Sequence, residues 1–209
     1  MSQQVLRISR PTKLELIRLR RRLAVARRLH RILRDRLTIL MQEFLVVLRK
    51  LYNERERLHK LLEDVYADYR LAVAMHGVAE LLATISPAST DTKVVAASRN
   101  VAGVRVPMVE VENYPPRNPL VPPSLVPLEL RKREVLDSLT RVAELEKELI
   151  LLGREMERTK RRVNMLEHVL IPRIERTIRY LMMKFEERER EEKVRLKRVK
   201  TVLARRRGE

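Results

Sequence analysis

The 209-residue chain contains no cysteine and no tryptophan, and it has only four glycines, five tyrosines and two phenylalanines. The absence of cysteine excludes disulfide bonds and metal sites built on thiolates. The scarcity of aromatic rings argues against an ordinary compact globule, because large rings supply much of the area that a globular core buries. Charge-free segments such as 71–79 and 118–128 are far shorter than the roughly 20 apolar residues that a membrane-spanning helix needs.

Charged and aliphatic side chains are abundant instead. Charged residues make up 35% of the chain, and 46 basic against 28 acidic side chains give a net charge of +18. Leu, Val and Ile combined with Arg, Glu and Lys are typical of long helices that bury a narrow seam. So basic a chain is expected to bind nucleic acid, an anionic membrane surface or an acidic protein surface.

The first long segment, 12–85, is predicted to be a coiled-coil helix. Thr12 and Glu15 have the spacing of a capping box, in which each side chain satisfies a free amide of the first turn. Alternating steps of three and four residues from Leu16 to Leu82 visit 20 positions, of which 17 are apolar. The three exceptions are His30, Glu54 and Asp68. A period of 3.5 residues held over this distance predicts a left-handed coiled coil.

The last segment, 128–207, repeats this pattern with one interruption. Apolar residues alternate by fours and threes from Leu145 to Leu170, and the phase then moves by one residue at Ile174. Pro172 lies at the phase shift, and a proline inside a helix removes a hydrogen bond and clashes with the preceding turn. We therefore expect a second coiled-coil helix that bends or unwinds locally near Pro172.

The middle segment, 86–127, is predicted to form a small head. Residues 93–97 and 104–111 are rich in β-branched side chains, which predicts a hairpin of two short strands joined by 98–103. Pro107 indicates an edge strand, and six prolines between 114 and 127 indicate an extended connector. The residues expected to build the hairpin are Val95, Gly103, Val104, Val106 and Pro107.

Two seams joined by a connector of this length are expected to pair with each other, because a tethered partner costs less entropy than a separate chain. The predicted fold class is therefore predominantly α-helical: a long antiparallel two-helix left-handed coiled coil with a small head that contains a β-hairpin. Both chain ends would lie at one tip. Segments 18–36 and 193–207 each carry a net charge of +8, so this tip would hold nearly all of the net charge.

No group of candidate catalytic residues emerges from the sequence. The glycines are isolated from one another, which excludes a glycine-rich phosphate loop. The histidines are scattered, and Glu167-His168 lacks the second histidine of a zinc-binding helix motif. The chain is therefore predicted to be non-catalytic and to hold no metal or cofactor.

Residues 161–178 read Arg-Arg-Val-Asn-Met-Leu-Glu-His-Val-Leu-Ile-Pro-Arg-Ile-Glu-Arg-Thr-Ile and resemble a motif of the D subunit of the archaeal-type and vacuolar-type rotary ATPases. The motif positions are Asn164, Leu166, Glu167 and Pro172. The resemblance continues in 186–197, in 33–37 and in 103–107. The chain departs from the family where Met165 replaces a usual alanine.

The resemblance implies a rotor shaft that stands inside a hexamer of alternating A and B subunits and transmits torque between ATP turnover there and ion flow through a membrane ring. The head would contact the F subunit and the adaptor subunit (called C or d) on that ring. The shaft itself would bind no nucleotide, and it would be cytoplasmic and peripheral to the membrane. The basic residues expected to face the hexamer are Arg20, Arg21, Arg22, Arg27, Arg28, Arg31, Lys197, Arg198 and Lys200.

Two other functions stay open on the residues alone. A coiled-coil nucleic-acid-binding protein could bind phosphates through the same basic tip. This chain, however, offers no module that reads bases, and the resemblance implies no nucleic-acid partner. A structural spacer could use both seams to form a homodimer with exposed heads. DNA binding at high salt would favour the first alternative, and a stable homodimer would favour the second.

Overall fold

The computed structural model describes residues 12–85, 92–114 and 121–208. They form two compact units. The terminal unit joins the residues up to Arg36 with those from Thr159 onward, and the middle unit runs from Leu37 to Arg158. The helices are α1 (Lys13–His76), α2 (Val78–Ile85), α3 (Val126–Met165) and α4 (Ile171–Arg207), with a short 3₁₀ turn at Pro123–Leu125 and a π-helical turn at Leu166–Leu170. The strands are β1 (Lys93–Val101) and β2 (Val104–Asn113).

Local interactions set both ends of the helix α1. The hydroxyl of Thr12 accepts a hydrogen bond of 3.2 Å from the backbone N–H of Glu15, which satisfies one free amide of the first turn. The helix ends at His76 because Gly77 adopts a φ of +75°, which a residue with a side chain rarely takes up. The predicted helical segment 12–85 thus holds two helices, α1 and α2. Met75, which the heptad pattern predicted to be buried, is 65% exposed.

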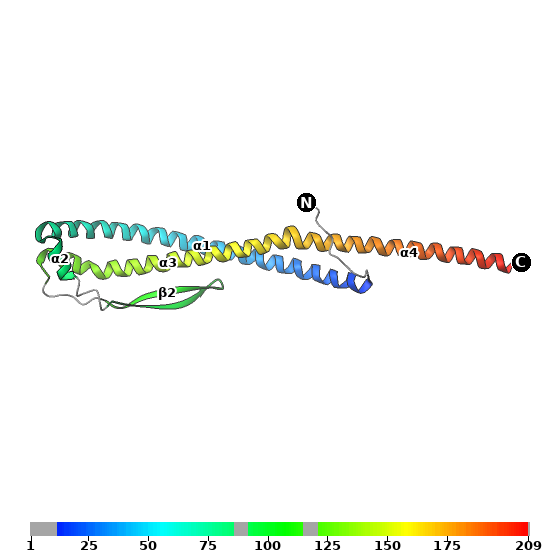
Figure 1. Ribbon diagram of the computed structural model, residues 1–209, viewed down its shortest axis with the longest axis horizontal. Helices are drawn as coiled ribbons and strands as arrows, with labels where there is room; N and C mark the ends of the chain where they lie inside the picture. Colours follow the sequence, from blue (N-terminus) through cyan, green and yellow to red (C-terminus); the bar gives the residue numbers. More distant parts are fainter. Residues whose placement is uncertain (1–11, 86–91, 115–120, 209) are drawn as a thin grey trace. The chain divides into compact units, whose positions relative to one another are not determined.

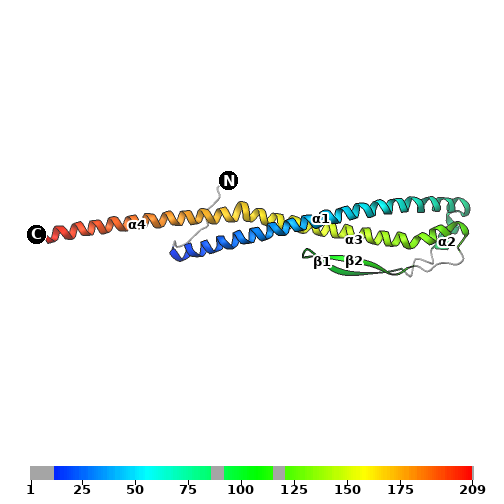
Figure 2. The ribbon, with the colours of Figure 1, turned by 180° about the vertical axis from the view of Figure 1, so that it is seen from behind.

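In the middle unit α1 and α3 run side by side in opposite directions, as Figures 1 and 2 both show. Their apolar side chains form one cluster of buried residues: Leu40, Val47, Leu51 and Leu58 from α1, with Val142, Leu145 and Leu152 from α3. All of these except Val142, which precedes the predicted stretch, are positions of the predicted seams. The antiparallel two-helix coiled coil with a small β-hairpin is therefore confirmed.

The far end of the middle unit has a smaller core of its own. Ala72, Leu81 and Leu125 are buried together, with Tyr69 and Val73 packed against them. Leu81 is buried there, whereas the pattern had placed Leu82 on the seam, because the break at Gly77 changes the helical phase. Among the described helices none is both long and apolar enough to cross a membrane.

The π-helical turn explains the phase shift that surrounds Pro172. The backbone N–H of Ile171 donates to the carbonyl of Leu166, five residues back, so this turn holds one residue more than an α-helical turn. The extra residue moves the apolar pattern forward by one position, and Leu166 and Ile174 are both only 4% exposed. The seam thus stays buried across the proline. A bend of the helix axis stays a prediction.

The strands β1 and β2 form an antiparallel hairpin with a turn of only two residues. Ala102 and Gly103 have φ values of +50° and +81°, which is the backbone of the type I′ turn that suits the twist of a hairpin. Residues 98–101, expected to be loop, therefore continue β1 and pair with β2. Pro107 lies opposite Ser98. Because this sheet has two strands, Pro107 lies on an edge strand, as predicted.

Candidate interaction surfaces

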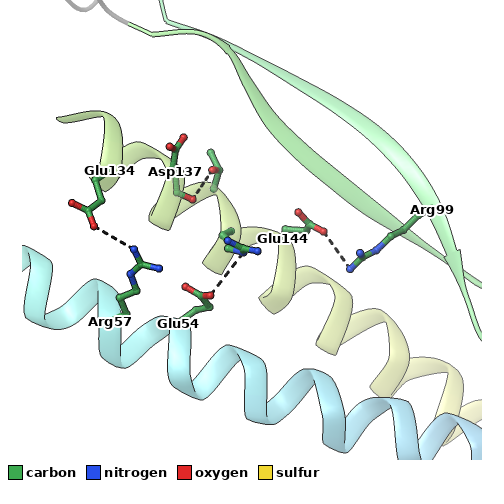
Figure 3. A network of polar contacts seen from close by, with 8 residues as sticks. Glu54, Arg57, Arg99, Glu134, Asp137 and Glu144 are labelled. Atoms are coloured by element: carbon green, nitrogen blue, oxygen red, sulfur yellow. Dashed lines mark hydrogen bonds and ion pairs between the residues drawn. The ribbon is translucent and has the colours of Figure 1, made fainter. Parts of the chain in front are cut away.

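An ion pair between the half-exposed Arg99 and the buried Glu148 joins the hairpin to the coiled coil. Arg99 on β1 donates a hydrogen bond of 2.7 Å from Nη2 to Oε2 of Glu148 on α3, and the same nitrogen lies 3.3 Å from Oε1 of Glu144. The Glu148 side chain is only 2% exposed. Figure 3 shows Arg99 reaching from the hairpin towards Glu144. A charge so deeply buried needs a partner, and Arg99 supplies one.

The tip of the hairpin adds apolar contacts to this ion pair. Val101, Ala102 and Val104 pack against the main core cluster of the middle unit. Val106 is 1% exposed, whereas Val95, nearer the open end, is 45% exposed. The predicted hairpin residues therefore have different environments: some bind the coiled coil and others face solvent. Within the middle unit the hairpin lies along the coiled coil.

A cleft of about 750 Å³ lies between the hairpin and the coiled coil. Its walls carry charges of both signs, including Glu54 of α1, which lies 3.8 Å from Arg141 of α3. At one side the hydroxyl of Tyr114 donates to the carboxylate of Asp137. This hydrogen bond raises the pKa of Tyr114 above its ordinary value, since a nearby carboxylate disfavours the phenolate. Within the described ranges no group of three or more His, Asp or Glu side chains could hold a metal ion.

The first basic segment lies on α1 of the terminal unit. Arg27 forms an ion pair of 2.6 Å with Glu175 of α4, and Arg20 contacts the sulfur of Met182 at 3.8 Å. The other predicted contact residues of this helix are solvent-exposed: Arg21, Arg22, Arg28 and Arg31. Some of the positive charge therefore holds the two helices together, and the rest is presented to solvent.

The second basic segment lies on the C-terminal part of α4. Every residue from Glu186 to Leu203 is exposed, including Lys197, Arg198 and Lys200. Apolar side chains are exposed on the same stretch, with Leu196 at 63%. Figures 1 and 2 show that α4 continues past the start of α1 within this unit. The two basic segments therefore follow one another along the terminal unit.

The motif residues 164–172 have packing roles in this unit. Leu166 is buried, Asn164 is exposed, and Pro172 lies in the first turn of α4. Oε2 of Glu167 lies 3.2 Å from Nε2 of His30. His30, which interrupts the apolar pattern of α1, thus lies beside a carboxylate of the segment that carries the motif.

Sequence reasoning missed Arg99, Glu144 and Glu148. Glu148 lies beside the apolar seam of α3, at a position where glutamate is usually exposed in a coiled coil. The pattern of α3 alone holds no signal for its burial, because the hairpin is what covers it.

Comparison with known proteins gives matches over nearly the whole chain. The sequence model of the ATP synthase D-subunit family matches residues 15–201. The D subunit of the A-type ATP synthase of Methanopyrus kandleri is 37% identical, over 98% of this chain and 91% of the relative. The A-type D subunit of Pyrococcus furiosus is 36% identical, over 93% and 94%. The D subunit of the V-type ATP synthase of Acetivibrio thermocellus is 35% identical, over 92% and 90%. The resemblance carried by residues 161–178 is confirmed.

Proposed function

Because the chain belongs to the ATP synthase D-subunit family, we propose that it is the central shaft of a rotary ATP synthase or ATPase. In this role it transmits torque between the A and B subunits, where ATP is made or hydrolysed, and the membrane ring that carries ions. It catalyses no reaction and binds no nucleotide or cofactor itself. It works at the cytoplasmic face of the membrane as a peripheral part of the complex.

The exposed C-terminal part of α4 carries this proposal. A single helix in water gains little stability from its own hydrogen bonds, and most helices in proteins depend on packing of an apolar face. Here Val194, Leu196 and Val199 are all more than half exposed and alternate with lysine and arginine. Such a helix is suited to a surrounding partner. A ring of A and B subunits would supply this enclosure.

Helix length also supports a shaft. The 64 residues of α1 correspond to about 96 Å of helix at roughly 1.5 Å per residue. A helix of this length can reach from a collar near the membrane into a catalytic ring. We assign the terminal unit to the A and B subunits, and the middle unit to the F subunit and the adaptor subunit.

Reconstitution with A and B subunits tests the proposal. The wild-type chain is expected to co-purify with them and to couple their ATP hydrolysis to rotation. A charge-reversal variant, Lys197→Glu with Arg198→Glu and Lys200→Glu, should keep the helical content of the chain. It should lose most of the coupling between ATP hydrolysis and rotation, because the exposed helix then presents negative charge where it presented positive charge.

A matched control reverses three exposed charges of the middle unit, Arg49→Glu with Lys147→Glu and Arg154→Glu. This control should keep its coupling to the A and B subunits. Normal coupling in the α4 variant would contradict the assignment of this segment to the hexamer. Failure of the wild-type chain to bind A and B subunits, together with DNA binding that persists at high salt, would favour the nucleic-acid alternative.

A further inference from the structure

The two strands of the hairpin differ in how far they face solvent. Residues 93–100 of β1 are all exposed, whereas β2 alternates between exposed and partly buried positions around the buried Val106. The strand β2 therefore lies nearer the coiled coil, and β1 presents its outer edge to solvent. Among the described residues the sheet has no third strand.

The register of the hairpin identifies the backbone groups on that free edge. A two-residue turn is closed by the hydrogen-bonded pair Val101 and Val104, and such pairs alternate with non-bonded pairs along the ladder. The amides of Ala97 and Arg99 consequently point towards β2. The N–H and C=O groups of Val94, Ala96 and Ser98 point outward.

Between Val94 and Ser98 this edge carries no proline and no charge, although the register is irregular at Lys93 and Val94 and Arg99 points towards the coiled coil. Natural edge strands carry prolines, bulges or inward-pointing charges that prevent pairing with other chains. On β2 Pro107 is at an outward-pointing position, but residues 94–98 of β1 read Val-Val-Ala-Ala-Ser. Lys93 and Arg99 flank this stretch; they pair with Glu112 and Glu148, but their side chains remain 64% and 44% exposed.

We propose that the outer edge of β1 accepts an extended strand of a partner protein, which adds a third strand to the sheet. This inference rests on the proposed function, because the partner is taken to be another subunit of the same complex. Main-chain hydrogen bonds to the outward groups of Ala96 and Ser98 would provide the affinity. The small side chains of Ala96 and Ala97 leave room for β-branched or aromatic residues on the neighbouring strand.

Charge argues for a different protein over a second copy. The strand β1 carries Lys93 and Arg99 and no acidic residue, so a neutral or acidic strand fits it. An antiparallel pair of two β1 strands joined through their outward groups and centred on Ala96 would place Lys93 of each copy opposite Arg99 of the other. Each chain also carries +18, which adds long-range repulsion.

Hydrogen exchange at single amides tests this proposal on the full chain, alone and reconstituted with the A, B and F subunits and the adaptor subunit. In the free chain the amides of Ala97 and Arg99 should be protected, and those of Ala96 and Ser98 should exchange rapidly. On assembly Ala96 and Ser98 should become protected as well.

The variant Ala96→Pro removes an outward N–H without removing a bond of the β1–β2 ladder. It should weaken assembly about tenfold, which corresponds to the roughly 1.4 kcal/mol of one good hydrogen bond. Val109→Pro is the matched control, because Val109 pairs with Ala96 and its N–H points to the opposite edge. It should assemble like wild type. Protection of Ala97 and Arg99 in both variants shows that the hairpin itself has formed.

Four results would overturn the inference. Assembly that leaves Ala96 and Ser98 unprotected shows that the edge stays open. Protection of these amides in the free chain, with a dimer in sedimentation, shows that a second copy covers the edge. If the wild-type chain does not assemble at all, the proposed function fails and this inference fails with it. Normal assembly of Ala96→Pro overturns this inference but leaves the proposed function intact.

Discussion

Arg99 of the hairpin and Glu148 of α3 form an ion pair between the hairpin and the coiled coil. The donor and acceptor are 2.7 Å apart, and the carboxylate is almost completely buried although the arginine remains partly exposed. Removing one partner of a buried pair leaves an uncompensated charge, which costs more than the pair contributes. The pair therefore specifies one position of the hairpin on the coiled coil.

Replacement of Arg99 by alanine should destabilise the chain more than replacement of both partners. In Arg99→Ala the Glu148 carboxylate stays buried without its partner, and we expect a loss of about 2–3 kcal/mol in the free energy of unfolding. In the double variant Arg99→Ala with Glu148→Leu an apolar side chain fills the site, so most of this loss should disappear. Urea unfolding followed by circular dichroism measures both.

Arg105→Ala is the control for the arginine variant, because Arg105 is exposed on the same hairpin. Its effect should stay within about 0.5 kcal/mol. Equal stability of Arg99→Ala and wild type would show that the ion pair does not hold the hairpin.

The π-helical turn should tolerate deletion of one residue only when Pro172 is also replaced. Deletion of Val169, which is 55% exposed, returns the turn to α-helical geometry and keeps the apolar seam in phase. Pro172 then lies in a regular helix, where proline costs about 3 kcal/mol. The deletion combined with Pro172→Ala should recover most of this loss. Thermal unfolding compares the two, and equal stability would contradict the link between the π turn and the proline.

Gly153→Ala should stabilise the chain. Gly153 lies inside α3, where glycine costs about 0.5–1 kcal/mol relative to alanine. A Cβ at this position would lie 3.6 Å from Cε2 of Phe44, which is an ordinary van der Waals contact. Denaturant unfolding should show a gain of this size. Gly153→Leu is the comparison, since its longer side chain should displace the ring and lower stability.

Tyr114 should ionise above its ordinary pKa of 10.0. The hydrogen bond to Asp137 favours the neutral phenol of the folded state, so its contribution to stability is complete below pH 10.0 and is lost as the pH rises through the folded pKa. The difference between the phenolate absorbance of wild type and Tyr114→Phe gives the titration of this residue alone. In Asp137→Ala the midpoint should fall towards the ordinary value, and an unchanged midpoint would contradict the assigned cause.

Particular residues show how much of the fold was predictable. The apolar alternation that includes Leu19, Leu40, Leu58 and Leu152 predicted the buried seam. Coiled-coil packing depends on the spacing of apolar residues, which can be read from the sequence. The one-residue phase shift at Ile174 likewise predicted a local change of the helix at Pro172. The same period failed at Met75, because Gly77 ends the helix through a backbone conformation that the pattern of apolar residues does not include.

The interaction surfaces were less predictable than the core. The arginines of 18–36 could be recognised as a charged segment, but their roles could not be separated. The structure pairs Arg27 with Glu175 and leaves Arg28 exposed, because the register between α1 and α4 decides which side chains meet. The turn at Ala102 and Gly103 also lengthened β1 beyond the predicted strand, because alanine in a left-handed conformation is not a strong sequence signal.

The sequence by itself determined the two apolar seams, the presence of a hairpin between them, the uneven distribution of charge and the resemblance to the family. These properties follow from local periodicity and from motifs that are read along the chain. Only the tertiary structure decided that the hairpin lies along α3, that Glu148 is buried against Arg99 and that the edge of β1 faces solvent. The first two depend on the contact between Arg99 and Glu148, which lie 49 residues apart along the chain, and no local pattern contains such a contact.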